Sequence, residues 1–388
     1  MVEHLVSNET SLTMGSVSEC LWDGVYRFIE LVLSLFYIMV PQRYTYDDPY
    51  QVPDYEVTVI PAIAFIFTIE LVTRFVQRKQ FPRYPDMIIN IWSALINTLA
   101  RIFLLTIIIS IYTWLYTNYR IVDLPLHSVW TWIISVLLVD FLYYWVHRSL
   151  HEFNILWAGH QFHHSPTDIN VTSALRNSII DMFVHDTTWL SLSVVIPPPL
   201  LVVHIQFNLL YQIWLHNEII GNMGFIEYII NTPRQHRVHH GRNAYCIDKN
   251  YGSLFMIWDR LFGTHQEPKE TRKIVFGVVP PTPNSFDMMT LQFGHYGHVW
   301  RKFKTVDGLT NKVSAIFKGP GWAPGKPRLG LLSDIPEPDA TLPRYSYDPY
   351  IAFWKMVYTG FHGAVVAIGF YRFVDHPNIV GLTLLNDI

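Results

Sequence analysis

The residues of this 388-residue chain that are best placed to do chemistry are histidines in three short clusters. The first cluster has the spacing H-x3-H and the other two have the spacing H-x2-H-H. Their members are His147 and His151, then His160, His163 and His164, then His236, His239 and His240. Residues three or four positions apart share one face of a helix, so each cluster directs its imidazoles toward one point. A metal site takes about four ligands, and the eight imidazoles therefore favour two ions that share the set.

Two further residues near these clusters are candidates for the site. His216, in Trp-Leu-His-Asn-Glu, is a possible ninth ligand. Glu152 follows His151 but lies about 100° around the helix, so it could bind a cofactor or substrate, relay protons, or be a solvated interfacial charge. The other histidines lack ligand spacing and are expected to be packing or interfacial residues: His127, His185, His204, His265, His295, His298, His362 and His376.

The ligand type alone does not name the metal, because imidazole binds zinc, copper, iron and nickel alike. The zinc-protease motif H-E-x-x-H is absent from the sequence. The clusters adjoin apolar segments, and oxidation of alkyl chains there requires activated oxygen and a redox metal, so we expect two iron ions. The chain has no G-x-G-x-x-G motif and no cysteine set for an iron–sulfur cluster. Reducing equivalents must therefore come from outside the chain.

The composition is that of a membrane protein. Charged residues are 15% of the chain, against roughly 25% in soluble proteins. The net charge of -3 rules against a broad nucleic-acid footprint. Cys20 and Cys246 are far apart, which argues against a disulfide framework or a thiolate metal site. Residues 1–20 lack the charged and apolar pattern of a cleaved signal peptide, so none is expected.

Apolar runs at 25–40, 57–73, 88–116, 129–146, 188–215 and 351–371 predict the membrane segments. The expected fold is an all-α integral membrane protein, a multi-span helical bundle with a cytosolic, histidine-rich di-metal cap. The run 130–146 should be a helix that His147 and His151 extend by one turn. Arg101 interrupts the third run and must snorkel or lie near the end of a span. The prolines 197–199 break the fifth run and predict two half-crossings that enter and leave on one side.

Loop charge predicts the orientation, because Lys and Arg concentrate on the cytoplasmic side. The connection 74–83 carries Arg74, Arg78, Lys79 and Arg83 and should be cytoplasmic, whereas the acidic connection before it should be lumenal. Counting onward brings all three clusters to the cytoplasmic face. We divide the chain into N-terminal membrane helices (1–128), a catalytic domain with the eight-histidine site (129–265), a Pro/Gly-rich interfacial loop region (266–345) and a C-terminal membrane segment (346–388).

Several stretches carry a resemblance to a known family. They are residues 140–152, 156–165, 203–212, 231–243 and 245–252, and the more widely shared 257–264. From about residue 50 to 335 the chain resembles the alkylglycerol monooxygenase family of the membrane fatty-acid hydroxylase (sterol desaturase) superfamily. The resemblance implies an endoplasmic-reticulum enzyme that uses tetrahydrobiopterin and O2 to hydroxylate the ether-linked carbon of an alkylglycerol, releasing a fatty aldehyde and a glycerol derivative. It also implies that the eight clustered histidines bind two irons and that Glu152 is a candidate for the pterin site.

Two other functions remain open at this point. One is a sterol or fatty-acyl hydroxylase or desaturase with the same metals, supplied with electrons by cytochrome b5. The other is a metal-binding membrane scaffold or transporter without turnover, which predicts ionisable residues spread along the spans rather than gathered at one face. The expected partners are the lipid substrate, O2 and the membrane, and no nucleic acid is expected.

Overall fold

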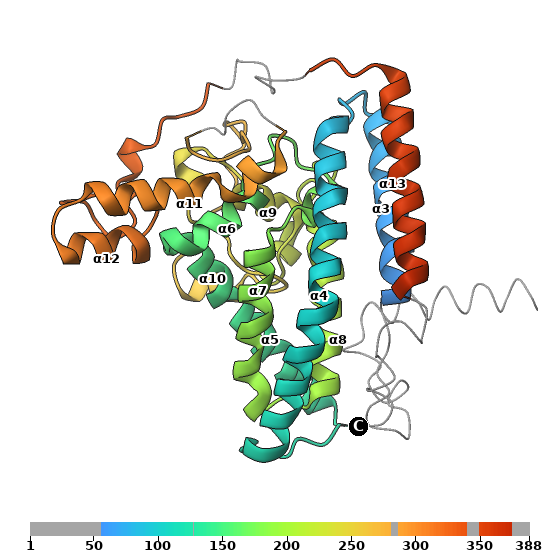
Figure 1. The fold of residues 1–388 in the computed structure, drawn as a ribbon, viewed down its shortest axis with the longest axis vertical. Coiled ribbons are helices and arrows are strands. Elements are labelled where there is room, and N and C mark those ends of the chain that lie inside the picture. The colour runs from blue at the N-terminus through green and yellow to red at the C-terminus, as the bar shows by residue number, and fades with distance from the viewer. Residues whose placement is uncertain (1–55, 127, 281–285, 340–348, 375–388) are drawn as a thin grey trace, which may run out of the picture.

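The computed structural model describes residues 56–126, 128–280, 286–339 and 349–374, and this part of the chain is helical (Figure 1). Its α-helices are α3 (Glu56–Val76), α4 (Tyr84–Tyr119), α5 (Val129–Glu152), α6 (Asn154–His164), α7 (Ile179–Thr188), α8 (Pro198–Leu215), α9 (Pro233–His239), α10 (Ile257–Leu261), α11 (Met288–Thr305), α12 (Leu309–Phe317) and α13 (Phe353–Val374). Short 3-10 turns are η2 (Val171–Leu175), η3 (Trp189–Val194), η4 (Gly224–Tyr228), η5 (Ala244–Cys246) and η6 (Leu332–Asp334). Within the described ranges, β-pairing is limited to two isolated bridges. The all-α prediction is confirmed.

Helix α5 carries the first histidine cluster. As the apolar run predicts, one helix continues through His147 and His151 and ends at Glu152. Among the described residues, α5 is the one helix that is by itself long and apolar enough to cross a membrane. Its histidine-bearing end is buried in the protein.

Helix α4 is bent. Its parts Tyr84–Arg101 and Leu104–Tyr119 meet at 47°, and together they meet the length and composition of a second crossing. Arg101 lies at this bend and was expected to snorkel or to end a span. Its guanidinium instead donates two hydrogen bonds of 2.9 Å to the carboxylate of Asp186 in α7. The charge is neutralised inside the protein, so snorkelling is not needed. The predicted run 25–40 lies outside the described residues.

The proline tripeptide joins two helical segments and starts the second of them. Helix α8 begins at Pro198, a position where the missing amide hydrogen costs nothing. The segment before the prolines consists of α7 and the 3-10 turn η3. It leads from Asp181, beside His160, to Val194, whose carbonyl accepts the amide of Ile121 just after α4, and α8 leads back to His216 in the histidine centre. The two segments are thus arranged as the predicted hairpin, and their entry into a membrane stays a prediction. The hydroxyl of Tyr112 in α4 donates to the carbonyl of Ile196 at 2.8 Å and fixes this corner against α4.

The composition of region 266–345 predicted a loop, and the structure shows that only part of the region is one. It contains α11 and α12, although residues 318–339 are irregular apart from η6. Glycine and proline raise the average loop propensity of the region, but α11 itself contains no proline. The Asp287 carboxylate accepts the amides of Met289 and Thr290 and so caps this helix. Helix α11 packs along α6, which carries the second histidine cluster.

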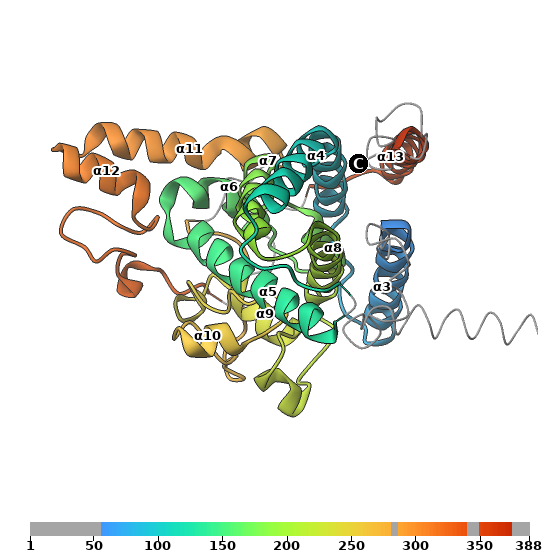
Figure 2. The ribbon, with the colours of Figure 1, turned by 90° about the horizontal axis from the view of Figure 1, so that it is seen from below.

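One basic residue of the predicted cytoplasmic connection, Arg74, has a structural role inside the protein. Arg74 lies within α3, is 1% exposed and donates to Glu70 at 2.8 and 2.9 Å and to the carbonyl of Ile169 at 2.9 Å. It is therefore a buried tether between α3 and the segment after α6, and not a loop charge. Figures 1 and 2 show α3 and α13 side by side at one edge of the molecule.

Candidate metal centre

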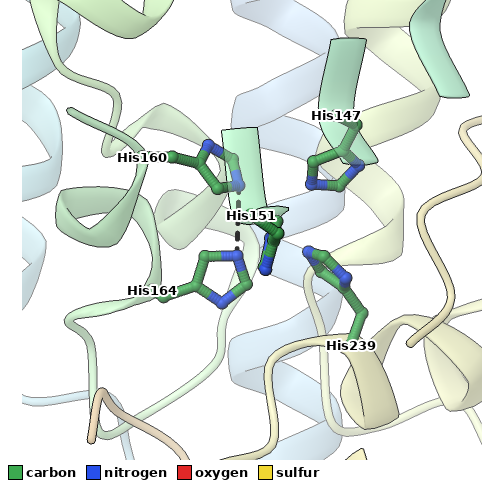
Figure 3. A group of neighbouring side chains, drawn as sticks. All are labelled: His147, His151, His160, His164 and His239. Carbon is green, nitrogen blue, oxygen red and sulfur yellow. Dashed lines mark hydrogen bonds between the residues drawn. The ribbon is translucent and has the colours of Figure 1, made fainter. Parts of the chain in front are cut away.

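Nine histidines converge in two adjoining groups, and all nine are buried. In each group, the candidate ligand nitrogens lie within 4.8 Å of one another. The five-histidine group contains His147, His151, His160, His164 and His239 (Figure 3). The four-histidine group contains His163, His216, His236 and His240. The structure thus brings together all eight clustered histidines and the ninth candidate.

Local structure explains how three helices meet here. Helix α5 ends at Glu152 and α6 starts two residues later, so the chain turns sharply and brings two histidine-bearing helices together. The third cluster lies on α9, which begins with Pro233 and is capped by the Thr232 side chain. His216 is the C-cap of α8. Every ligand candidate therefore sits in a helix or at its end.

The two groups adjoin each other. The ring of His164 stacks on the ring of His240, with centroids 4.4 Å apart. The ring of His239 also stacks on that of His236, at 5.2 Å. Rings of the two groups are thus in contact, as the prediction of two ions sharing one set of histidines requires.

In the four-histidine group the Nε2 atoms point at one another. His216 Nε2 lies 3.0 Å from the Nε2 atoms of His236 and His240 and 3.2 Å from that of His163. A proton can form a hydrogen bond between two of these Nε2 atoms, but it cannot satisfy all four of them at once. An imidazole nitrogen lies about 2.1 Å from a divalent ion such as zinc, which places two ligands at right angles about 3.0 Å apart. The donor set therefore fits a metal ion.

In the five-histidine group several Nε2 atoms are buried without hydrogen-bond partners in the described part of the chain. They belong to His147, His151 and His239. His160 and His164 approach each other through Nε2 at 3.2 Å, as the dashed line in Figure 3 marks. Buried polar atoms are normally satisfied, so these orphaned nitrogens also fit a ligand-bound metal.

The other ring nitrogen is fixed by contacts that the histidine pattern did not reveal. His147 Nδ1 lies 2.9 Å from the carbonyl of Tyr251, and His239 Nδ1 lies 2.9 Å from the carbonyl of Lys249. Such contacts orient an imidazole and direct its other nitrogen to the metal. Both carbonyls come from one tight segment, in which Asp248 and Asn250 have φ of 56°. The stretch 245–252 was part of the family resemblance, but sequence reasoning gave it no role.

Asp181 is a second group that sequence reasoning missed. Its carboxylate lies 3.1 Å from His160 Nδ1, and both side chains are buried. The Ser178 hydroxyl accepts the Asp181 amide and caps α7, which places the carboxylate at the start of that helix. A carboxylate behind a histidine raises the basicity of the ligand. No sequence signal marked Asp181, because its contact depends on how α7 packs against α6.

Burial keeps the imidazoles of His216 and His239 neutral. It lowers the pKa of His239 to about 3 and the pKa of His216 to about 4. Both side chains are therefore unprotonated at physiological pH, as a metal ligand must be.

Glu152 lies at the edge of the centre between two arginines. Its carboxylate accepts Arg148 Nε at 2.7 Å and also pairs with Arg328 from the irregular segment after α12. Its side chain is 10% exposed, whereas Arg328 is 44% exposed. The carboxylate thus connects the end of α5 to a surface segment.

Described histidines without ligand spacing lie outside both groups, as expected. His204 in α8 is buried and packs edge-on against Trp132 of α5, with ring centroids 5.9 Å apart. His295 in α11 contacts Asn154 at 2.9 Å. His127 and His376 lie outside the described residues.

Comparisons with known proteins agree with the location of this centre. The family model named fatty acid hydroxylase matches residues 132–264, which include all nine histidines. The chain is 45% identical over 304 residues to alkylglycerol monooxygenase of Homo sapiens, covering 78% of this chain and 68% of the relative. The chain belongs to the alkylglycerol monooxygenase family.

Two more relatives support the assignment. The alkylglycerol monooxygenase of Xenopus tropicalis is 41% identical over 331 residues, covering 85% of this chain and 73% of the relative. That of Danio rerio is 41% identical over 304 residues, covering 78% and 68%. No solved structure matches the chain.

Proposed function

We propose that this chain is a di-iron monooxygenase that cleaves the ether bond of alkylglycerols. The observation that carries the proposal is its high identity to alkylglycerol monooxygenases across a region that contains the complete nine-histidine centre. Iron supplies oxygen activation when it is bound by the nine imidazoles. Burial of the centre holds these imidazoles in fixed positions and would exclude bulk water from the reacting carbon.

The proposed reaction inserts one oxygen atom of O2 into a C–H bond of the ether-linked carbon. The second oxygen atom leaves as water, and tetrahydrobiopterin supplies the two electrons and two protons that this requires. The hydroxylated carbon is a hemiacetal, which breaks its C–O bond to give a fatty aldehyde and the free glycerol derivative. An external donor fits a chain without sequence motifs for an internal dinucleotide or iron–sulfur cluster.

We also propose that the enzyme is a multi-pass protein of the endoplasmic reticulum membrane, with its centre facing the cytosol. Helix α5 supports this, because it has the length of a span and carries His147 and His151 at one end. The alkyl tail of the substrate would lie beside the apolar helices while its glycerol head reaches the histidines. The basic residues Arg78 and Lys79, after α3, support the cytosolic orientation.

Glu152 is our proposal for a residue that binds the pterin. Its carboxylate is an acceptor suited to the N–H groups along one edge of a pterin ring. It lies one residue after a candidate ligand, and its partner Arg328 is partly exposed and can be reached from outside. Arg148 and Arg328 hold the carboxylate in position.

The function is tested with membranes that contain the full chain. They are incubated with an alkylglycerol and O2, with or without tetrahydrobiopterin, and the released fatty aldehyde is measured. We expect aldehyde only with the pterin, and none from His147→Ala membranes with the same amount of protein. Pterin-dependent turnover should coincide with two irons per purified chain. Turnover supported only by NADPH, a reductase and cytochrome b5 would contradict the proposal and favour the sterol or fatty-acyl hydroxylase.

A further inference from the structure

Helix α12 exposes three of its four large apolar residues and buries two small ones. Leu309, Val313 and Phe317 repeat every four residues and are 78%, 48% and 53% exposed. On the inner side, Ser314 and Ala315 are 8% and 1% exposed. A surface helix of a soluble protein normally shows the opposite arrangement. We call Leu309, Val313 and Phe317 the α12 face.

This exposure does not come from a loosely attached helix. The Asn154 side chain at the start of α6 donates to the carbonyl of Ala315 at 2.8 Å. The Asn154 amide donates to the carbonyl of Lys318, also at 2.8 Å. His295 of α11 contacts the same asparagine at 2.9 Å. Helix α12 is therefore fixed to the helix that carries the second histidine cluster, with its apolar face outward.

Basic side chains stacked on aromatic rings lie on the two helices beside this face. The rings of Trp300 and Phe303 in α11 stack with centroids 5.5 Å apart. Lys304 lies over the Trp300 ring at 5.5 Å, and Lys312 of α12 lies over the Phe303 ring at 5.7 Å. Trp300 is 58% exposed. Exposed aromatic and aliphatic side chains next to lysines are typical of helices that lie in a membrane interface.

The arrangement of helices agrees with that location. Figure 1 shows α11 and α12 lying across the direction of α4, the bent helix that has the length of a crossing. Figure 2 shows α11 along its length while α13 is seen end-on. Helices that lie across the spans run parallel to the plane of a bilayer.

Charge decides between a bilayer and a second copy of the chain. Residues 288–318 contain five Lys or Arg and one Asp. In a symmetric dimer this surface would face itself, and like charges would repel. Three side chains also offer little area against the roughly 1,000 Å² that a stable interface needs. Anionic phospholipid headgroups complement the charge.

We propose that α11 and α12 form an in-plane membrane anchor. The α12 face inserts among the outer acyl segments of the bilayer, and Lys304 and Lys312 bind anionic phospholipid headgroups. Because α11 and α12 pack on α6, the anchor sets the position of the histidine centre relative to the lipid surface. This inference does not depend on the identity of the substrate.

Insertion is tested with a fluorescent label on the full chain in lipid nanodiscs. Cys20→Ser removes one native thiol, and burial raises the pKa of Cys246 to about 12, so it resists labelling at neutral pH. An environment-sensitive dye is attached at Val313→Cys or, as a matched control, at the exposed Glu270→Cys. We expect lipids with a nitroxide near the headgroup to quench the label at 313 strongly and the label at 270 weakly. Equal quenching at the two positions would overturn the proposal.

The choice of lipid is tested with charge reversals. Quenching at position 313 should be greater in discs with phosphatidylserine than in phosphatidylcholine alone. Lys304→Glu with Lys312→Glu should lower the ratio of inserted to free anchor by more than about thirtyfold in the anionic discs, the factor expected from loss of the two positive charges alone. The matched pair Lys269→Glu and Lys273→Glu, two exposed lysines outside the anchor, should leave it unchanged. Shielding that occurs only with two chains per disc would identify a second copy as the occupant and overturn the proposal.

Discussion

The two histidine groups are built differently although they adjoin each other. In the five-histidine group the ring nitrogens are directed from behind by distant segments, through the carbonyls of Lys249 and Tyr251 and the carboxylate of Asp181. In the four-histidine group, His236 and His240 have buried Nδ1 atoms without hydrogen-bond partners in the described part of the chain. Their Nε2 atoms instead crowd together at 3.0 Å. The other two rings of this group are supported, because His163 Nδ1 lies 3.1 Å from the carbonyl of Arg176 and His216 Nδ1 lies 2.7 Å from that of Gln212. The groups therefore differ at His236 and His240, whose rings have no such support from behind.

The difference suggests how each group tolerates damage. A group with five imidazoles and external support retains four oriented ligands after one is lost. A group with four retains three, and the unsupported rings can then turn away. We therefore expect the four-histidine group to release its metal more readily, while the reaction needs both ions in a fixed geometry.

The largest effect is expected from matched substitutions on α9. His236→Ala and His239→Ala lie three residues apart and belong to different groups. Both should abolish aldehyde release, and so should His147→Ala and His163→Ala. Iron per purified chain should fall to about one in His236→Ala and stay nearer two in His239→Ala. A greater iron loss in His239→Ala would reverse the comparison, and full activity in any variant would remove that residue from the ligand set.

The spacing of the histidines predicted each cluster, because residues three or four apart on a helix must share a face. It could not predict the two groups. On α6, His163 points about 100° away from His164, and it joins the other group because α8 and α9 approach from that side. The external supports were equally hidden. The carbonyls of Lys249 and Tyr251 reach the rings only because Asp248 and Asn250 adopt φ of 56°.

For the fold, too, the sequence predicted local elements better than the contacts between them. The apolar run before His147 predicted α5 well, since its pattern is continuous and contains no breaker. Helix α11 was missed, although Asp287 is a capping residue at its start. Gly294 and Gly297 each cost about 1 kcal/mol relative to alanine in a helix. The packing of α11 on α6 offsets that cost, and no local pattern reveals such a contact.

A smaller effect is expected from removing one external support. Asp181→Asn keeps the shape of the side chain but removes the charge behind His160, so activity and iron affinity should fall about 10- to 100-fold. The iron affinity is measured by competition with a chelator. An effect on turnover alone would leave this affinity unchanged. The control Asp287→Asn replaces one capping residue with another at the start of α11 and should be neutral. Unchanged iron affinity in Asp181→Asn would show that the five-histidine group does not depend on this carboxylate.

Glu152→Gln should affect the pterin more than the metals. Loss of the charge should raise the KM for tetrahydrobiopterin about tenfold, the usual scale for one hydrogen bond to a charged group. The KM for the alkylglycerol and the iron content should stay the same. A lower iron content with an unchanged KM for the pterin would instead make Glu152 a positioning residue of the five-histidine group.

The smallest effect on activity is expected at His204, in the same helix that ends before His216. His204 is buried against Trp132 and belongs to neither histidine group. His204→Ala should lower the free energy of unfolding by about 2–4 kcal/mol through the cavity it leaves, while the folded protein keeps two irons and its aldehyde release. His216→Ala is the matched variant: it removes a ligand of the four-histidine group, and one iron should be lost with it. Thermal unfolding and iron content, measured on both variants, separate the two roles. Loss of iron from His204→Ala at a temperature where the chain is folded would contradict the prediction. It would mean that His204 also supports the geometry of the metal ligands.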